Sequence, residues 1–69
     1  MQLNDMEIKK ILDQGFLTRS RIETETAMKK CQMFKEMAQD AGVKGFFEEQ
    51  AKGLEDVLGI FNKGMAEIQ

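Results

Sequence analysis

Residues 43–69 read VKGFFEEQAKGLEDVLGIFNKGMAEIQ, and this stretch decides the fold. Residues on one side of a helix recur here at alternating spacings of four and three: Val43, Phe47, Gln50, Leu54, Val57, Phe61, Gly64 and Ile68, with Phe46, Ala51, Leu58 and Met65 beside them. Such spacing is typical of an amphipathic helix. The apolar stripe is wider than a two-stranded coiled-coil seam, so covering it requires more than one neighbouring helix.

The small size of the chain limits how it can be stabilised. A sequence of 69 residues allows one domain with a small core, and such cores usually need a disulfide, a metal or a partner. The chain has one cysteine and no histidine, which excludes an internal disulfide and argues against a zinc site. We therefore expect oligomerisation.

Charge and composition restrict the kind of partner and the compartment. The net charge is −2 and the charges are mixed, so we expect no nucleic-acid partner. No apolar run is long enough to span a membrane, and the first residues do not resemble a secretory signal. A lone thiol suits a reducing compartment, so we expect the protein to be cytoplasmic.

The absence of proline favours helix throughout, and the pattern predicts a first helix over about residues 4–40. Asn4, with Glu7 three residues later, outlines an N-terminal capping box. Apolar residues follow at helical spacing up to Phe16, and after a polar interlude a second stripe runs from Met28 to Ala41. A break near Gly15 remains the alternative, because the two stripes differ in phase.

The sequence Asp40-Ala41-Gly42 marks the boundary between the helices. Gly42 is well placed as a left-handed residue that ends a helix. We expect the turn at residues 41–42 and the second helix over about residues 43–68. Because the connection is short, the two helices should be antiparallel neighbours.

The residues around this boundary resemble a known family. Residues 31–38 read CQMFKEMA, residues 40–42 read DAG, and residues 43–51 read VKGFFEEQA. Together they resemble half of a rubrerythrin-type ferritin-like protein, in which a helix with an aromatic and a small residue precedes a turn and an F-E-E-x-A helix. Phe34 and Ala38 match the first of these helices, and residues 47–51 match the second. Small spore-coat-like proteins share this hairpin, so the resemblance also implies an association with spores.

The family's metal ligands are missing from the corresponding positions. The glutamate of the first helix corresponds to Ala27, and the E-x-x-H pair of the second corresponds to Leu54 and Val57. Di-iron sites need carboxylate and imidazole ligands. The resemblance thus implies a ferritin-like bundle without a metal, a cofactor or the family's oxidase or peroxidase activity.

No residue is a strong candidate for catalysis. Cys31 lies on the apolar stripe, where a thiol acts as a small apolar group, and no histidine is present to activate it. The carboxylates, such as Glu48 and Glu55, fit a solvated helix surface. Met33, Ile22 and Leu17 suggest a second apolar face that would suit an oligomer contact. We expect the following side chains to form the core or the oligomer interface: Met28, Cys31, Phe34, Met37, Phe47, Leu54, Val57, Phe61 and Met65.

The sequence as a whole predicts an all-α fold, a long antiparallel helical hairpin that dimerises into a four-helix bundle. The function that fits is a non-catalytic structural or interaction protein that self-associates through apolar helix faces. The alternative is an adaptor or chaperone-like module that binds a helix of a partner protein. A catalytic or metal-binding protein is the least favoured of the three.

Overall fold

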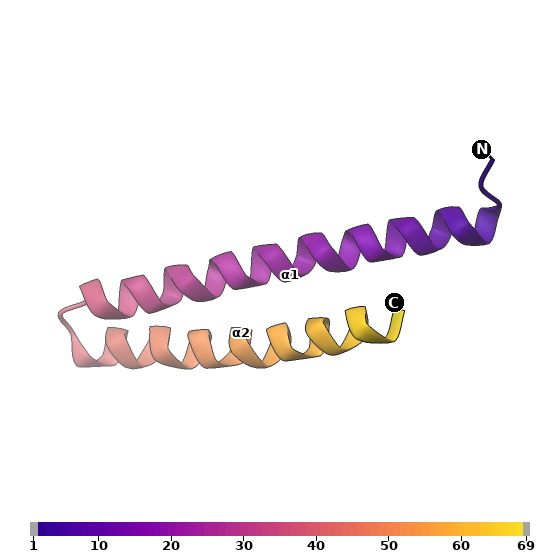
Figure 1. Cartoon of the computed structure of the whole chain (residues 1–69). Coiled ribbons are helices and arrows are strands. Elements are labelled where there is room, and N and C mark those ends of the chain that lie inside the picture. Colours follow the sequence, from indigo (N-terminus) through magenta and orange to yellow (C-terminus); the bar gives the residue numbers. More distant parts are fainter. Residues whose placement is uncertain (1, 69) are drawn as a thin grey trace.

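The computed structural model of the chain is a hairpin of two long antiparallel helices (Figure 1). It describes the backbone of residues 2–68 and the side chains of these residues except 65, 67 and 68. Helix α1 spans Asp5–Met37 and helix α2 spans Ala41–Ile68. No strand occurs within residues 2–68, so the prediction of an all-α helical hairpin is confirmed.

Helix α1 begins where the capping box predicts. The Oδ1 atom of Asn4 accepts a hydrogen bond of 2.8 Å from the backbone N–H of Glu7. In return, the Nδ2 atom of Asn4 lies 3.3 Å from the Oε1 atom of Glu7. Asp5 and Glu7 also place negative charge in the first turn, where the helix dipole favours it. The hydrogen bond from the backbone N–H of Glu7 to Asn4 satisfies a donor in the first turn that has no partner within the helix.

The polar interlude of α1 is continuous helix, and α1 does not break near Gly15. Three ion pairs span one helical turn each along this segment: Arg19 with Glu23, Arg21 with Glu25, and Lys29 with Glu25. Pairs at this spacing stabilise a helix by about 0.2–0.5 kcal/mol each. The hydroxyl of Thr24 donates a 2.8 Å hydrogen bond to the backbone carbonyl of Ser20, so this part-buried polar side chain has a partner within the helix.

The turn lies earlier than the sequence suggests, so the predicted boundaries of 4–40, 41–42 and 43–68 need correction. Helix α1 ends at Met37 because Ala38 adopts an extended backbone, with φ −69° and ψ 141°. Helix α2 already begins at Ala41 because Asp40 caps it, its Oδ1 atom accepting a 3.0 Å hydrogen bond from the backbone N–H of Val43. Gly42 is therefore helical, and no residue in the described part of the chain has a positive φ.

The two helices pack along their whole shared length, but the core between them is thin. The side of α2 that faces α1 carries Phe47, Ala51, Leu54, Leu58 and Phe61. Of the described side chains only Ala51 is buried, with 8% of its surface exposed. The others remain half-buried because a single layer of two helices covers each side chain from one direction only.

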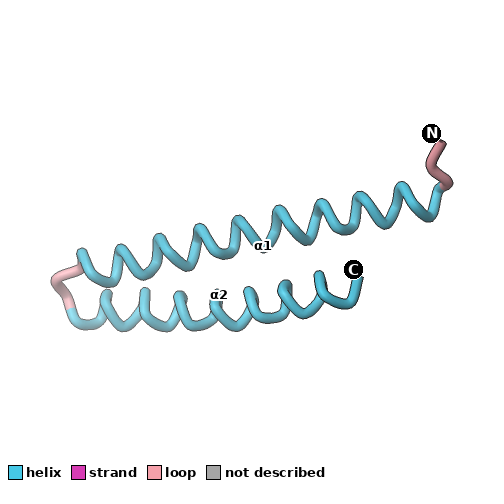
Figure 2. The backbone as a smooth tube through the Cα atoms, viewed as in Figure 1, coloured by secondary structure: helices cyan, strands magenta, loops and turns pink. Residues whose placement is uncertain are grey.

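The shape of the hairpin is that of a thin rod, as the tube drawing shows (Figure 2). Its principal extents are 57 × 18 × 11 Å and its radius of gyration is 16.6 Å, whereas a compact domain of this length has a radius of gyration of about 11 Å. The chain exposes 5643 Å² of surface, whereas a compact monomer of 7.9 kDa exposes about 4,400 Å². The excess is about 1,200 Å² per chain.

Helix α1 is also longer than its neighbour, with 33 residues against 28 in α2. Its N-terminal turns project beyond the C-terminal end of α2 (Figure 1). We call residues 5–12 the free end of α1. Four exposed apolar side chains lie there: Met6, Ile8, Ile11 and Leu12.

Candidate functional site: an open apolar face

One broad side of the hairpin carries its exposed aromatic side chains, and on α1 the charged Glu23 and Lys30 lie between them. On α1, Phe16 and Phe34 are 18 residues apart, which is about five full helical turns, so they point the same way. On α2, Phe46 and Val57 are 11 residues apart and also share one direction to within about 20°. We call the following exposed side chains the apolar face: Leu12, Phe16 and Phe34 of α1, with Val43, Phe46 and Val57 of α2.

A row of aromatic rings shows that the two helices present these side chains on the same side. The ring of Phe34 lies 5.3 Å from that of Phe47, and the ring of Phe47 lies 5.3 Å from that of Phe46. Phe47 thus joins the exposed rings of both helices across the hairpin, near the turn. Tilted and edge-on pairs at this distance are favourable, so the row also ties the helices together.

The opposite side of the hairpin carries the ion pair between the two helices. Glu48 lies about 200° from Phe46 around α2, and it pairs with Lys35 of α1 at 3.6 Å and with Lys52 at 3.9 Å. A shallow hollow on this side is lined by Gln32, Lys35, Glu48, Ala51, Lys52 and Glu55. All three charged partners are partly exposed, so each pair contributes at most about 1 kcal/mol. The hairpin is therefore a thin layer with exposed aromatic rings on one side and these ion pairs on the other, at whose α1 edge Ile22 and Met33 are also exposed.

The predicted core and interface residues fall into three groups in the single chain. Half-buried between the helices are Met28, Cys31, Phe47, Leu54 and Phe61. Phe34 and Val57 lie on the apolar face, and Met37 is 70% exposed at the end of α1. The side chain of Met65 lies outside the described residues.

The second apolar face proposed from Met33, Ile22 and Leu17 does not form as predicted. Ile22 and Met33 are both exposed, and they lie within about 20° of each other on α1. Leu17 is five residues before Ile22, about 140° away, and it is half-buried on the side toward α2. The prediction grouped residues by their apolar character and did not follow the phase of the helix.

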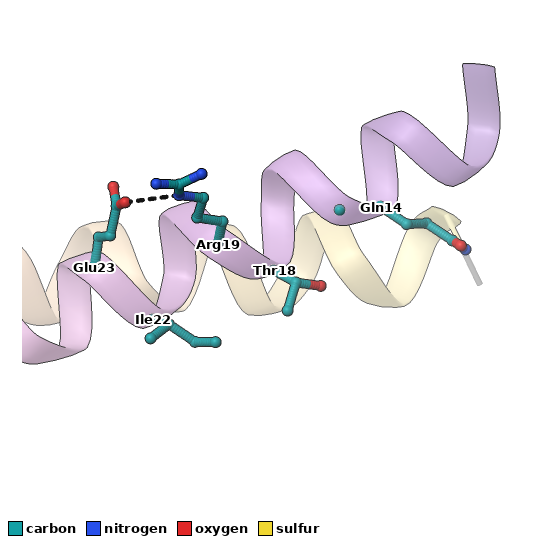
Figure 3. Close-up of a pocket in the computed structure, with 6 residues that line it drawn as sticks. Gln14, Thr18, Arg19, Ile22 and Glu23 are labelled. Atoms are coloured by element: carbon teal, nitrogen blue, oxygen red, sulfur yellow. Dashed lines mark hydrogen bonds and ion pairs between the residues drawn. The ribbon is translucent and has the colours of Figure 1, made fainter. Parts of the chain in front are cut away.

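A recess on α1 lies beside Ile22, on the helix surface (Figure 3). It is lined by Gln14, Gly15, Thr18, Arg19, Ile22 and Glu23, so a single helix supplies all its walls. It exists because Gly15 has no side chain and an added Cβ there would meet nothing within 4 Å. Arg19 and Glu23 pair on one side of the helix, while Thr18 and Ile22 point to the other (Figure 3). The recess is open to solvent.

The polar groups of the described residues do not converge on a metal or membrane site. No group of three or more His, Cys, Asp or Glu residues lies close enough together to hold a metal ion. Of the three apolar positions that the sequence comparison aligned with metal ligands, Ala27 and Leu54 are half-buried and Val57 is exposed. Neither helix, as far as described, is long and apolar enough to cross a membrane.

The apolar face was only partly identifiable from sequence. The wide stripe of α2 predicts that Phe46 and Val57 are apolar contacts, and the aromatic positions Phe16 and Phe34 follow from periodicity. Which side of the hairpin they share depends on how α1 and α2 are rotated against each other, and that rotation is known only from contacts such as Phe34 with Phe47.

Comparison of the chain with models of protein families, with curated proteins and with solved structures finds no match.

Proposed function

We propose that this protein is a non-catalytic structural or interaction module that acts as a dimer, in which two hairpins form a four-helix bundle. The observation that carries the proposal is that Ala51 is the one buried side chain of those described. A folded state without a core has little to offset the loss of conformational entropy, so an isolated hairpin would be marginal.

The excess surface of the hairpin has the size of a dimer interface. About 1,200 Å² per chain corresponds to about 2,400 Å² for a pair, within the range of permanent homodimers. The apolar face supplies side chains suited to this burial, with Phe16 65% exposed and Phe46 56% exposed. Full burial of an exposed phenylalanine stabilises by roughly 1.5–3 kcal/mol, so covering these side chains favours association.

The non-catalytic part of the proposal rests on the chemistry of the side chains. The chain has no histidine, and its one thiol, Cys31, is half-buried. A nucleophile needs an adjacent base or a depressed pKa to react at neutral pH. Stoichiometric iron or manganese in the purified protein would contradict this part of the proposal.

The test compares two exposed side chains of α1 that differ in the face they occupy. Phe16→Glu places a charge on the apolar face, while Ile22→Glu makes a similar change about 120° away on α1. Both side chains are exposed in the single hairpin, so neither change disturbs an intramolecular core. We expect Phe16→Glu to weaken the dimer at least about tenfold, as judged by sedimentation velocity, because the lost burial exceeds 1.4 kcal/mol.

Ile22→Glu should leave the dimer affinity within about threefold of the original. Equal dimerisation of the two variants would refute the role of the apolar face. A hairpin that stays monomeric and folded would instead favour the alternative function, an adaptor whose open face binds a helix of another protein.

A further inference from the structure

We infer that α2 makes the close contact between the two copies, and that it packs against the partner's α2 in a register fixed by a repeat in its sequence. The inference rests on the proposed self-association and adds to it the helix that is covered and the residues that face each other. We call the following residues the α2 stripe: Val43, Phe46, Gln50, Gly53, Val57, Ile60 and Gly64.

The α2 stripe is an open helix face without charge. Its members recur at alternating spacings of three and four, so all lie within about 60° of Phe46 around α2. Its large members are between 39% and 70% exposed: Val43, Phe46, Val57 and Ile60. The same side of α1 carries the exposed charges of Glu23 and Lys30, which are costly to bury. A partner can therefore pack closely on α2 and not on α1.

Large and small residues of α2 follow a repeat of 11 residues. Residues 42–52 read GVKGFFEEQAK and residues 53–63 read GLEDVLGIFNK, so each repeat begins with glycine, ends with lysine and has apolar second, fifth and sixth positions. Residue 64 is again glycine. Eleven residues make three helical turns plus about 20°, so these glycines line one side of α2.

The single chain gives no packing reason for two of these glycines. An added Cβ at Gly53 or Gly64 would meet no atom within 4 Å. Glycine is the least favourable residue within a helix apart from proline, so it weakens α2 at both positions. A second helix that approaches this side closely supplies the missing reason.

The repeat makes the α2 stripe complementary to itself when the two helices are antiparallel. With residue 55 at the middle of the pair, residues whose numbers add to 110 are level with each other. Phe46 then faces the partner's Gly64, and Gly53 faces the partner's Val57. The midpoint of α2 lies between residues 54 and 55, so this register also gives nearly full overlap. A large side chain opposite a small one allows two helices to interdigitate.

A parallel pair of α2 helices lacks this fit. Residues of the same number would be level, so Phe46 would meet the partner's Phe46, and Gly53 would meet the partner's Gly53. The bulky pair would hold the helices apart at one level and leave a void at the next. Because unfilled space between packed side chains costs stability, the repeat favours the antiparallel direction.

The position of the glycines keeps the charges of α1 in water. Gly53 lies about 160° from the buried Ala51 around α2, so the closest approach of the pair is on the side turned away from α1. The two α1 helices are therefore farther apart than the two α2 helices. Glu23 and Lys30 stay in contact with solvent in the gap between them.

The same register also covers a ring of α1. The ion pair between Lys35 and Glu48 shows which residues of α1 and α2 are level within one copy. It places Phe16 level with residue 67 of its own α2, and hence with the partner's Val43, which lies on the side of the α2 stripe toward α1. A second copy thus accounts for the excess surface of about 1,200 Å² per chain, because each copy covers the same face of the other.

The test exchanges the residues of one facing pair. Gly53→Val alone places valine opposite valine, and Val57→Gly alone places glycine opposite glycine. We expect each change to weaken the dimer at least about tenfold by sedimentation velocity, because the first overfills the contact and the second leaves a void. The double variant has the composition of the original chain and restores a large residue opposite a small one. Its dimer affinity should return to within about threefold of the original.

The double variant distinguishes the inferred register from other contacts. In a parallel pair each exchanged residue would meet its own counterpart, so the double variant would dimerise no better than the weaker single variant. That result would overturn the inference and leave the proposed dimer intact. Circular dichroism at high chain concentration checks that each variant keeps its helical content.

A second measurement leaves the α2 stripe unchanged. Spin labels are attached through Lys44→Cys or Ala66→Cys, each in a Cys31→Ala background, and both positions are exposed on the side of α2 away from the stripe. In mixed dimers the inferred register places residue 44 level with the partner's residue 66. Two labels at residue 44 are instead 22 residues, about 33 Å, apart along the pair.

Pulsed electron paramagnetic resonance should therefore give a shorter distance between labels at 44 and 66 than between two labels at 44. The reverse order of the two distances would overturn the inference alone. An original chain that stays a folded monomer would overturn both the inference and the proposed function.

Discussion

Short polar side chains determine where each helix begins. Asn4 accepts from the backbone N–H of Glu7, and Asp40 accepts from that of Val43, each three residues into the chain that follows. Both therefore satisfy a donor that the helix itself leaves free. Asp40 also has a hydrogen bond of 3.0 Å from the N–H of Lys44 to its own carbonyl oxygen, which starts the hydrogen-bonding pattern of α2.

The role of Asp40 is open to a direct mutational test. Asp40→Ala removes the acceptor for Val43 and should lower the free energy of unfolding by about 1 kcal/mol. Asp40→Asn keeps an acceptor oxygen and should lower the free energy of unfolding by only about 0.3 kcal/mol, because asparagine is an equally good cap. Urea denaturation at one fixed chain concentration measures both. Equal losses in the two variants would show that the charge, and not the cap, is responsible.

The same residue explains why the sequence misplaces the turn. Gly42 resembles a left-handed helix end, so Asp40 is taken as the end of the first helix. In fact the capping preference of Asp40 competes with that of Gly42 and prevails, and Gly42 enters α2 as an ordinary helical residue. Helix α1 ends at Met37, three residues before the predicted end at about residue 40, and no feature of the Ala38 side chain signals this position.

At the scale of the elements, periodicity was sufficient to predict two long antiparallel helices. The wide stripe of α2 identifies Phe47, Leu54 and Phe61 as residues that contact a neighbour, and all three lie half-buried against α1. The weaker pattern of α1 did not reveal which side faces α2. Its contact side includes Thr24 and Arg21, both polar and half-buried, so apolar spacing alone assigned Leu17 to the wrong group.

Substitutions at two glycines of α2 distinguish the intrinsic stability of the helix from the effect of a partner helix. Gly59 lies on the solvated side and Gly53 lies near the direction of Phe46, and an added Cβ at either would meet no atom within 4 Å of the single chain. Gly59→Ala should raise the free energy of unfolding by about 0.5–1 kcal/mol, the usual gain from alanine within a helix.

Gly53→Ala should gain less than Gly59→Ala, or lose stability, because an approaching helix of the partner would meet the new methyl group. Thermal unfolding of both variants at the same chain concentration measures the difference. Equal gains at the two positions would indicate that no partner helix comes close to Gly53.

At the scale of the whole molecule, the hairpin is a folded layer that lacks a second layer. Domains are built from at least two packed layers around one core, whereas this chain forms one layer with a smallest extent of 11 Å. The polar side carries the ion pairs of Glu48, and the other side carries exposed rings such as Phe16 and Phe46. The central claim is that a second copy supplies the missing layer and that folding and association are coupled.

The solution mass and helical content, followed together over a dilution series, test this claim most directly. Sedimentation equilibrium from high micromolar to nanomolar chain concentrations, with circular dichroism on the same samples, should show twice the chain mass of 7.9 kDa at the upper end. Helical signal should fall as the dimer dissociates, because binding of the partner stabilises the folded chain by mass action. A chain that keeps its full helical signal as a 7.9 kDa monomer across the series would contradict the account.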